Sequence, residues 1–147
     1  MKCPAGIDES TAMVVGPAGG KLTLAGRQGN GVPSSLTIPP KAFDRDVTIT
    51  LVETSIPPPK EFVDWSPIWE VLPSCLTSFS RMTLRLPYSN RDGLVGPITI
   101  YHAKDRNSPF VPLPEVYGNA GFGDGAITEG GLFFVGYPKS PGQANCP

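Results

Sequence analysis

Short runs of alternating hydrophobic and polar residues recur along the chain. The clearest covers residues 47–53 (VTITLVE), in which every second side chain is apolar. Val47, Ile49 and Leu51 would face one way and the threonines between them the other, as in a strand with one buried face. β-Branched residues, which favour strands, dominate this run. The same reasoning predicts strands over residues 13–15, 21–25, 34–38, 47–53, 68–72, 82–86, 97–102 and 131–137, an edge strand over 109–114 and a weaker strand near 125–128.

Glycine and proline separate these runs. They number 17 and 18, and they are spread along the chain rather than gathered in one tract. Such residues form turns between strands, and the glycine-rich stretches GPAGG (16–20) and GNAGFGDG (118–125) are predicted to be hairpin turns. No segment carries the apolar period of a helix. About eight to ten short strands joined by turns predict an all-β fold, an antiparallel β-sandwich, formed by a single domain over residues 1–147.

Charge and hydropathy argue against two kinds of partner. The net charge is −1 at pH 7, and the 12 lysines and arginines are scattered along the chain. Nucleic-acid binding uses a basic stripe that contacts several phosphates, so we expect no nucleic-acid partner. No apolar run approaches the roughly 20 residues that cross a bilayer as a helix, so no transmembrane segment is expected. Lys2 is not followed by the apolar stretch of a signal peptide, which fits either a cytosolic protein or a mature chain.

Three cysteines bear on the compartment. Cys3 and Cys146 lie near the two ends of the chain, and Cys75 lies near its middle. Because the termini of a domain often lie close together, a disulfide between Cys3 and Cys146 would join the two tails and imply an oxidising compartment. Three unpaired thiols are the alternative. The chain has no CxxC motif and His102 is its only histidine, so no metal site and no cofactor are expected.

The sequence shows no catalytic constellation. Nucleophilic catalysis needs a nucleophile, a base and an orienting group, and no serine lies in a G-x-S-x-G motif. A hydrolase would have to pair His102 with Cys75 or with a serine. Cys75 lies between two predicted strands, where burial as a small apolar residue is the preferred interpretation, and His102 is interpreted as a partly exposed strand-end residue. We therefore expect no enzymatic activity.

Aromatic residues near the triple proline at 57–59 are candidates for a recognition surface. They are Phe62, Trp65 and Trp69. Tryptophan on a β-sandwich can stack on a sugar ring or fill a pocket of a partner protein. Trp69 alternates with Val71 and fits the core better, whereas Trp65 fits the core and the surface equally well. These residues support carbohydrate binding, with a glycan as ligand, as an alternative function.

An ordered set of motifs covers about half the chain, from Gly16 to Tyr88. The set comprises GGKL (19–22), LTIPPKAF (36–43), DVTITLVE (46–53), SPIWEVLP (66–73) and MTLRLPY (82–88). In order and spacing these motifs resemble the ZU5 family, whose domains have a glycine turn, a double-proline corner and a strand similar to TITL. The family usually has glycine where Lys41 stands, so this corner must accept a non-glycine residue.

The resemblance implies a β-sandwich whose ZU5-like core spans residues 13–90. Residues 91–137 would add about three or four strands, and residues 138–147 would form an extended tail. It also implies a non-enzymatic protein–protein interaction or structural module, with a protein partner or self-association in a surface or particle assembly. Similarity to bacterial surface and secreted proteins implies an extracellular or cell-surface location. Some ZU5-containing proteins cleave themselves at His-Phe-Ser, but Ser78-Phe79-Ser80 lacks the histidine, so self-cleavage is not expected here.

Overall fold

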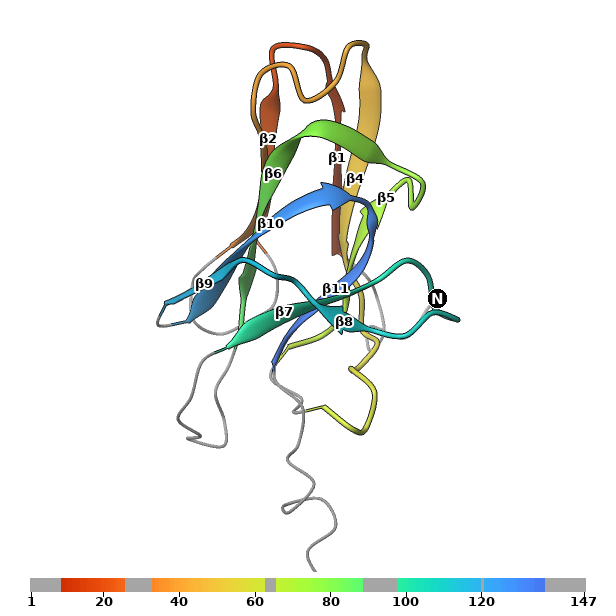
Figure 1. Ribbon diagram of the computed structural model, residues 1–147, viewed down its shortest axis with the longest axis vertical. Coiled ribbons are helices and arrows are strands. Elements are labelled where there is room, and N and C mark those ends of the chain that lie inside the picture. Colours follow the sequence, from red (N-terminus) through yellow and green to blue (C-terminus); the bar gives the residue numbers. More distant parts are fainter. Residues whose placement is uncertain (1–8, 26–32, 63–65, 89–97, 120, 137–147) are drawn as a thin grey trace, which may run out of the picture.

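The computed structural model describes residues 9–25, 33–62, 66–88, 98–119 and 121–136. Within these residues the chain forms eleven strands and no helix. The strands make two antiparallel sheets that pack face to face (Figure 1). The predicted all-β antiparallel sandwich is therefore confirmed.

The two sheets contain six and five strands. In spatial order, the six-stranded sheet holds β1 (Glu9–Val15), β4 (Val47–Glu53), β5 (Trp69–Leu72), β11 (Gly131–Gly136), β7 (Thr99–Ala103) and β8 (Val111–Pro112). In spatial order, the five-stranded sheet holds β2 (Gly20–Leu24), β3 (Ser34–Ile38), β6 (Thr77–Pro87), β10 (Phe122–Glu129) and β9 (Val116–Asn119). The predicted edge strand over 109–114 is found as β8, at the edge of its sheet.

The main core lies between the two sheets. In β4, Ile49 and Leu51 are fully buried while Thr48 is exposed, which confirms the predicted alternation. β11 is buried along its whole length, because it lies inside the six-stranded sheet and is covered on both faces. Each fully buried aliphatic side chain stabilises the fold by about 1.5–3 kcal/mol. The largest buried side chains of this core are Trp69, Phe133, Leu36, Ile49, Leu51, Met82, Leu84, Leu86 and Ile100.

The chain crosses between the sheets at two glycine corners. β1 and β2 are joined through Gly16 and Gly19, where the Gly19 N–H donates to the Gly16 carbonyl oxygen at 3.0 Å and the φ of Gly19 is 81°. β10 and β11 are joined through Gly130 and Gly131, and Gly131 has a φ of 126°. Positive φ favours glycine because a Cβ atom would clash with the backbone. A turn is found at 16–20, but it is not the predicted hairpin turn, because the strands that it joins, β1 and β2, lie in different sheets.

A third corner, after β3, places a non-glycine residue in the left-handed region. Lys41 has a φ of 67°, and its backbone N–H donates to the Pro17 carbonyl oxygen at 2.7 Å. A side chain in this conformation costs about 1 kcal/mol or more. The corner therefore does accept a non-glycine residue, as the sequence required, and it does so at a conformational cost.

Replacing Lys41 by glycine is expected to raise the free energy of unfolding by about 0.5–1 kcal/mol, because relief of the left-handed strain outweighs the added freedom of the unfolded chain. Urea unfolding followed by circular dichroism would measure the change. Lys41→Ala is the matched control, since it removes the same charge but keeps the strain, and it should give no gain. A Lys41→Gly variant no more stable than Lys41→Ala would contradict the prediction.

A second, smaller core covers the outer face of the six-stranded sheet. Two side-chain hydrogen bonds hold the connection from β4 to β5 in place. Thr54 Oγ1 donates to the Ile68 carbonyl oxygen at 2.6 Å and joins the two ends of the connection, and Ser66 Oγ accepts from the Val135 N–H of β11 at 2.9 Å. The triple proline at 57–59 therefore lies beside the sheet, with Pro58 buried. The buried members of this second core are Ile68, Tyr101, Ala103, Leu132 and Phe134, with Ile56, Phe62 and Phe110 packed against them.

The second core makes stability sensitive to alkaline pH through Tyr101. Burial raises the pKa of its hydroxyl above the ordinary value. The unfolded chain then loses this proton at lower pH than the folded protein, so the free energy of unfolding should fall as pH rises past about 10. Urea midpoints measured at about pH 8 and about pH 11 should show a smaller loss for Tyr101→Phe than for the wild type. The exposed Tyr117 supplies the control. Tyr117→Phe should lose as much stability between the two pH values as the wild type does. If Tyr101→Phe also loses as much as the wild type, burial of Tyr101 is not the cause of the loss.

Candidate functional site

Trp69, one of the three predicted recognition residues, lies in the main core. Its side chain is fully buried, and across the sheet it faces Glu53 of β4 and Phe133 of β11. No described residue accepts a hydrogen bond from its indole Nε1. The interpretation of Trp69 as a core residue is confirmed. Its inclusion in a recognition surface was wrong, because a ligand in solvent cannot reach it.

Phe62, the second recognition candidate, packs into the second core. Its ring centroid lies 4.7 Å from that of Tyr101 and 5.1 Å from that of Phe134. Aromatic pairs at such distances stabilise packing, so Phe62 holds the β4–β5 connection on the sheet and presents only part of its ring to solvent. Trp65, Cys3 and Cys146 lie outside the described residues. The predicted role of Trp65 and the predicted disulfide therefore stay predictions.

Cys75 is exposed and carries a free thiol, so the prediction that it is buried was wrong. It sits in the turn after β5, where the Leu76 N–H donates to the Pro73 carbonyl oxygen at 3.0 Å. Leu76, and not Cys75, packs its side chain into the main core. Cys75 instead lines a surface cleft of about 360 Å³, which it shares with Asp44, Arg45, Phe79 and other residues.

His102 lies in a different cleft, also of about 360 Å³, which is lined by residues of both sheets. Its ring stacks on Phe133 with centroids 4.5 Å apart, and its Nε2 lies 3.0 Å from the Gly130 carbonyl oxygen. Because a carbonyl oxygen only accepts, Nε2 carries the hydrogen of this bond. The prediction of a partly exposed histidine is confirmed. The ring is held in place by stacking and one hydrogen bond.

The chemistry of this cleft is limited. Arg81 forms an ion pair with Glu115, so the cation is already neutralised by a neighbouring carboxylate. Glu129 and Thr128 add further polar groups, and neither serine nor cysteine is among the described residues that line the cleft. The pairing of His102 with a serine or a cysteine is therefore not found among the described residues of this cleft. The hydrolase candidate based on Cys75 is not assembled either, since the thiol and the imidazole line different clefts.

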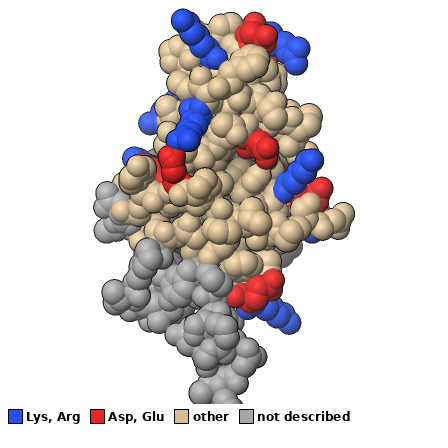
Figure 2. Space-filling view, viewed as in Figure 1, with Lys and Arg blue, Asp and Glu red and all other residues tan. Residues whose placement is uncertain are grey.

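The outer face of the five-stranded sheet carries another neutralised charge pair. The Arg85 guanidinium donates to both carboxylate oxygens of Asp124, at 2.7 and 2.9 Å, and it lies 4.2 Å from the centroid of the Phe122 ring. The hydrogen bond to Asp124 raises the pKa of Arg85. On the face shown in Figure 2, positive and negative side chains are interspersed rather than gathered into a stripe of one sign.

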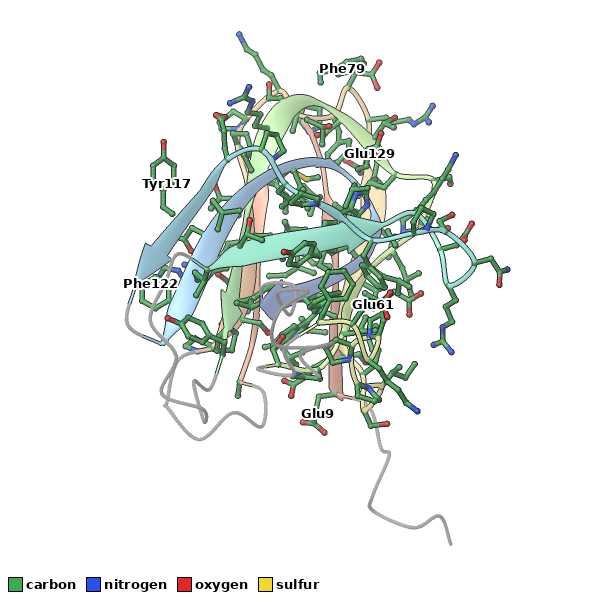
Figure 3. All side chains as sticks on the ribbon, turned by 60° about the horizontal axis from the view of Figure 1, so that its bottom comes forward. Glu9, Glu61, Phe79, Tyr117, Phe122 and Glu129 are labelled. Atoms are coloured by element: carbon green, nitrogen blue, oxygen red, sulfur yellow. The ribbon has the colours of Figure 1, made fainter. Side chains whose placement is uncertain are left out.

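Two aromatic side chains that the sequence did not single out are strongly exposed. Phe79 of β6 is 77% exposed and Tyr117 of β9 is 76% exposed. Figure 3 shows them projecting from different parts of the molecule, Phe79 beside the end that carries Glu129 and Tyr117 from the side of the sheet. They therefore do not form one platform on which a sugar ring could stack.

The free edge of β1 is the surface that the sequence did not reveal. β1 pairs with β4 along all seven residues without a register shift, from Glu9 opposite Glu53 to Val15 opposite Val47. No described strand pairs with its other side. Such an edge leaves backbone N–H and C=O groups available to another strand. Met13 and Val14 are 41% and 61% exposed along it.

The other three sheet edges are shorter or blunted. β8 has two residues, one of them Pro112, which has no N–H to donate. β9 has four residues, and β2 has five with the exposed Lys21 among them. Lysine, proline and short length are the usual ways in which proteins block pairing at an edge. Among the described edges, β1 alone combines length, regular pairing and freedom from lysine and proline.

The described residues hold no group of three or more histidine, cysteine or acidic side chains that could bind a metal ion. They also hold no helix with the length and hydropathy needed to cross a membrane. Comparison of the chain with models of protein families, and with curated protein sequences, finds no match in either case.

Proposed function

We propose that this chain is a non-enzymatic protein–protein interaction or structural module that serves as a subunit of a surface or particle assembly. The observation that carries the proposal is the free edge of β1. It offers seven regularly spaced residues with no described strand paired to their outer side. A strand added to such an edge gains main-chain hydrogen bonds, and its alternate side chains supply specificity.

The side chains of this edge support the same function. β1 has the sequence ESTAMVV, so Glu9 is its only charged residue, and Val14 is exposed without being part of either core. An exposed apolar edge is a predicted site of strand pairing, because burial of its side chains adds to the main-chain hydrogen bonds. An extracellular or cell-surface location, with a Cys3–Cys146 bridge formed in an oxidising compartment, belongs to the same proposal.

The distribution of reactive groups supports a function without catalysis. The exposed thiol of Cys75 and the imidazole of His102 line separate clefts, and the arginine in the His102 cleft is paired with Glu115. A binding role needs none of these groups. It needs a surface whose shape the fold holds constant, which the regular β1–β4 ladder provides.

The proposal is tested by looking for protein contacts of the intact chain. Sedimentation over a range of concentrations detects self-association, and immobilised chain incubated with an extract of its source cells, followed by mass spectrometry, detects other partners. We expect self-association, binding of another protein, or both. We also expect Ala12→Lys in β1 to weaken the contact that is found. A chain that stays monomeric and retains no protein would overturn the proposal.

A further inference from the structure

We infer that two copies of this chain pair edge to edge through β1, antiparallel and about a two-fold axis at Ala12, so that their six-stranded sheets become one continuous sheet. The inference rests on the proposed interaction function and names its partner as a second copy of the chain. Three features of the described residues carry it: the free edge of β1, the placement of charge at its ends, and the self-complementary order of its side chains.

The free edge gives the pairing its backbone contacts. β1 is antiparallel to β4 and in register with it from Glu9 to Val15, so its outer side presents backbone groups at regular spacing along seven residues. An antiparallel copy can satisfy the unpaired N–H and C=O groups of both strands at once. A two-fold axis makes the two surfaces identical, which closes the pair as a dimer instead of building a fibre.

Charge decides between the two directions in which the copies could pair. Glu9 is the only charged residue of β1 and stands at its start (Figure 3). Parallel pairing in register would set the two Glu9 carboxylates side by side, and like charges directly opposite are destabilising. Antiparallel pairing centred on Ala12 places them at opposite ends of the ladder, about 20 Å apart at about 3.4 Å per residue.

The antiparallel register also brings Glu9 to a basic end of the second copy. There it would lie opposite Val15, at the corner where β2 begins. Gly20 of β2 lies against Met13 and Val15, and the exposed Lys21 follows it. The backbone of Lys41 reaches the same corner through its bond to Pro17. The exposed cations at this corner and in the run leading into β4 are Lys21, Lys41 and Arg45, and the exposed carboxylates are Asp44 and Asp46. Cations therefore outnumber carboxylates by one, which makes this end weakly complementary to Glu9.

The side chains of β1 also fit against an antiparallel copy of the same strand. With the axis at Ala12, polar and apolar residues face one another across the pair and no bulky side chains meet at the centre. Met13 of one copy would cover Thr11 of the other, and the exposed Val14 would cover Ser10, as cross-strand neighbours on the same face. The expected pairs are Glu9 with Val15, Ser10 with Val14, Thr11 with Met13, and Ala12 with Ala12 of the second copy.

The dimer is expected to be weak in isolation. Seven paired residues form a contact well below the roughly 1,200–2,000 Å² that stable complexes bury. Sedimentation from about 10 µM to about 1 mM should therefore show a monomer–dimer equilibrium that shifts with concentration, as mass action requires. A wild-type chain that remains monomeric over this whole range would overturn the inference.

Ala12→Lys tests the axis, because it places two ammonium groups opposite each other and should weaken association by about tenfold or more. The matched control is Thr48→Lys on β4. Thr48 is exposed and opposite Val14 but one strand away from the edge, so this variant should associate like the wild type. Circular dichroism and urea midpoints check that both variants fold. Equal association of Ala12→Lys and the wild type would overturn the inference.

A mixture of Ala12→Lys and Ala12→Glu chains tests the register. In a two-fold pair centred on Ala12 the lysine of one variant faces the glutamate of the other, so the mixture should associate more tightly than either variant alone. If the mixture gains nothing, the register is wrong and the inference fails. Should the wild type stay monomeric but bind another protein, the interaction function survives and this inference alone falls. Should it bind nothing at all, both fall.

Discussion

Gly131→Ala is expected to lower the free energy of unfolding by about 3 kcal/mol or more. Gly131 opens β11 at the corner where the chain passes from the five-stranded sheet to the six-stranded one. Its φ of 126° is a conformation that side chains rarely adopt, and an added Cβ would lie 2.5 Å from the Ala103 carbonyl oxygen. That oxygen belongs to the backbone of the neighbouring strand β7, so it cannot move aside without disturbing the ladder between Leu132 and Ala103.

The measurement is urea unfolding of Gly131→Ala beside Gly20→Ala. Gly20 also lies in a strand at a corner between the sheets, but an added Cβ there would make ordinary contacts of 3.5–3.8 Å with Met13 and Val15 and would meet no φ barrier. Gly20→Ala should therefore stay within about 1 kcal/mol of the wild type. If Gly131→Ala behaves like Gly20→Ala, the corner is not as tightly constrained as its geometry requires.

The strands that the sequence predicted best are those in which buried apolar side chains alternate with more exposed polar ones. β3 and β4 were predicted with their observed bounds because buried apolar residues alternate with polar ones in both: Leu36 and Ile38 flank the exposed Thr37 in β3, and Ile49 and Leu51 alternate with threonines in β4. β6 was predicted only over 82–86, although it begins at Thr77. Its first five residues are exposed or half-buried, so they extend the ladder beyond the core and carry no apolar alternation.

β10 shows how the glycine-rich start of a strand escapes detection, since a strand was predicted only near 125–128 of its length. The stretch 118–125 was predicted to be a hairpin turn, and the turn between β9 and β10 does lie within it, since Asn119 pairs with Phe122. The residues that follow continue as a long strand. Gly123 and Gly125 face inward without side chains because Ile98 and Leu113 fill the space from neighbouring segments, within 2.7 and 2.9 Å of an added Cβ. Single-sequence patterns cannot show which distant side chain occupies such a space.

The candidate site could not be predicted because an edge is a property of the whole sheet. The sequence indicated a strand only over 13–15, whereas β1 begins at Glu9. Its neighbour β4 follows more than thirty residues later, and β11, which fills the middle of the same sheet, comes from the far end of the chain. The segment after residue 91 was expected to add about three or four strands to a finished core. It supplies five, and three of them, β7, β10 and β11, lie inside the sheets.

Trp69→Ala is expected to cost about 3–5 kcal/mol of unfolding free energy, because it removes the largest side chain of the main core and leaves a cavity. The Trp69 side chain is fully buried between its neighbours on β4 and β11. This prediction separates the two roles that the sequence left open for this tryptophan. A surface residue used for recognition would change stability by no more than about 0.5 kcal/mol when truncated.

Trp69→Phe sharpens the test, because the indole N–H of Trp69 is a buried hydrogen-bond donor. Its buried Nε1 has no acceptor among the described residues, and an unpaired buried donor costs about 1–3 kcal/mol. Phenylalanine removes this donor and keeps much of the ring, so Trp69→Phe should lose far less stability than Trp69→Ala. Urea unfolding of both variants gives the comparison. Equal losses would mean that the indole N–H is satisfied in solution, and that shape alone fixes tryptophan at this position.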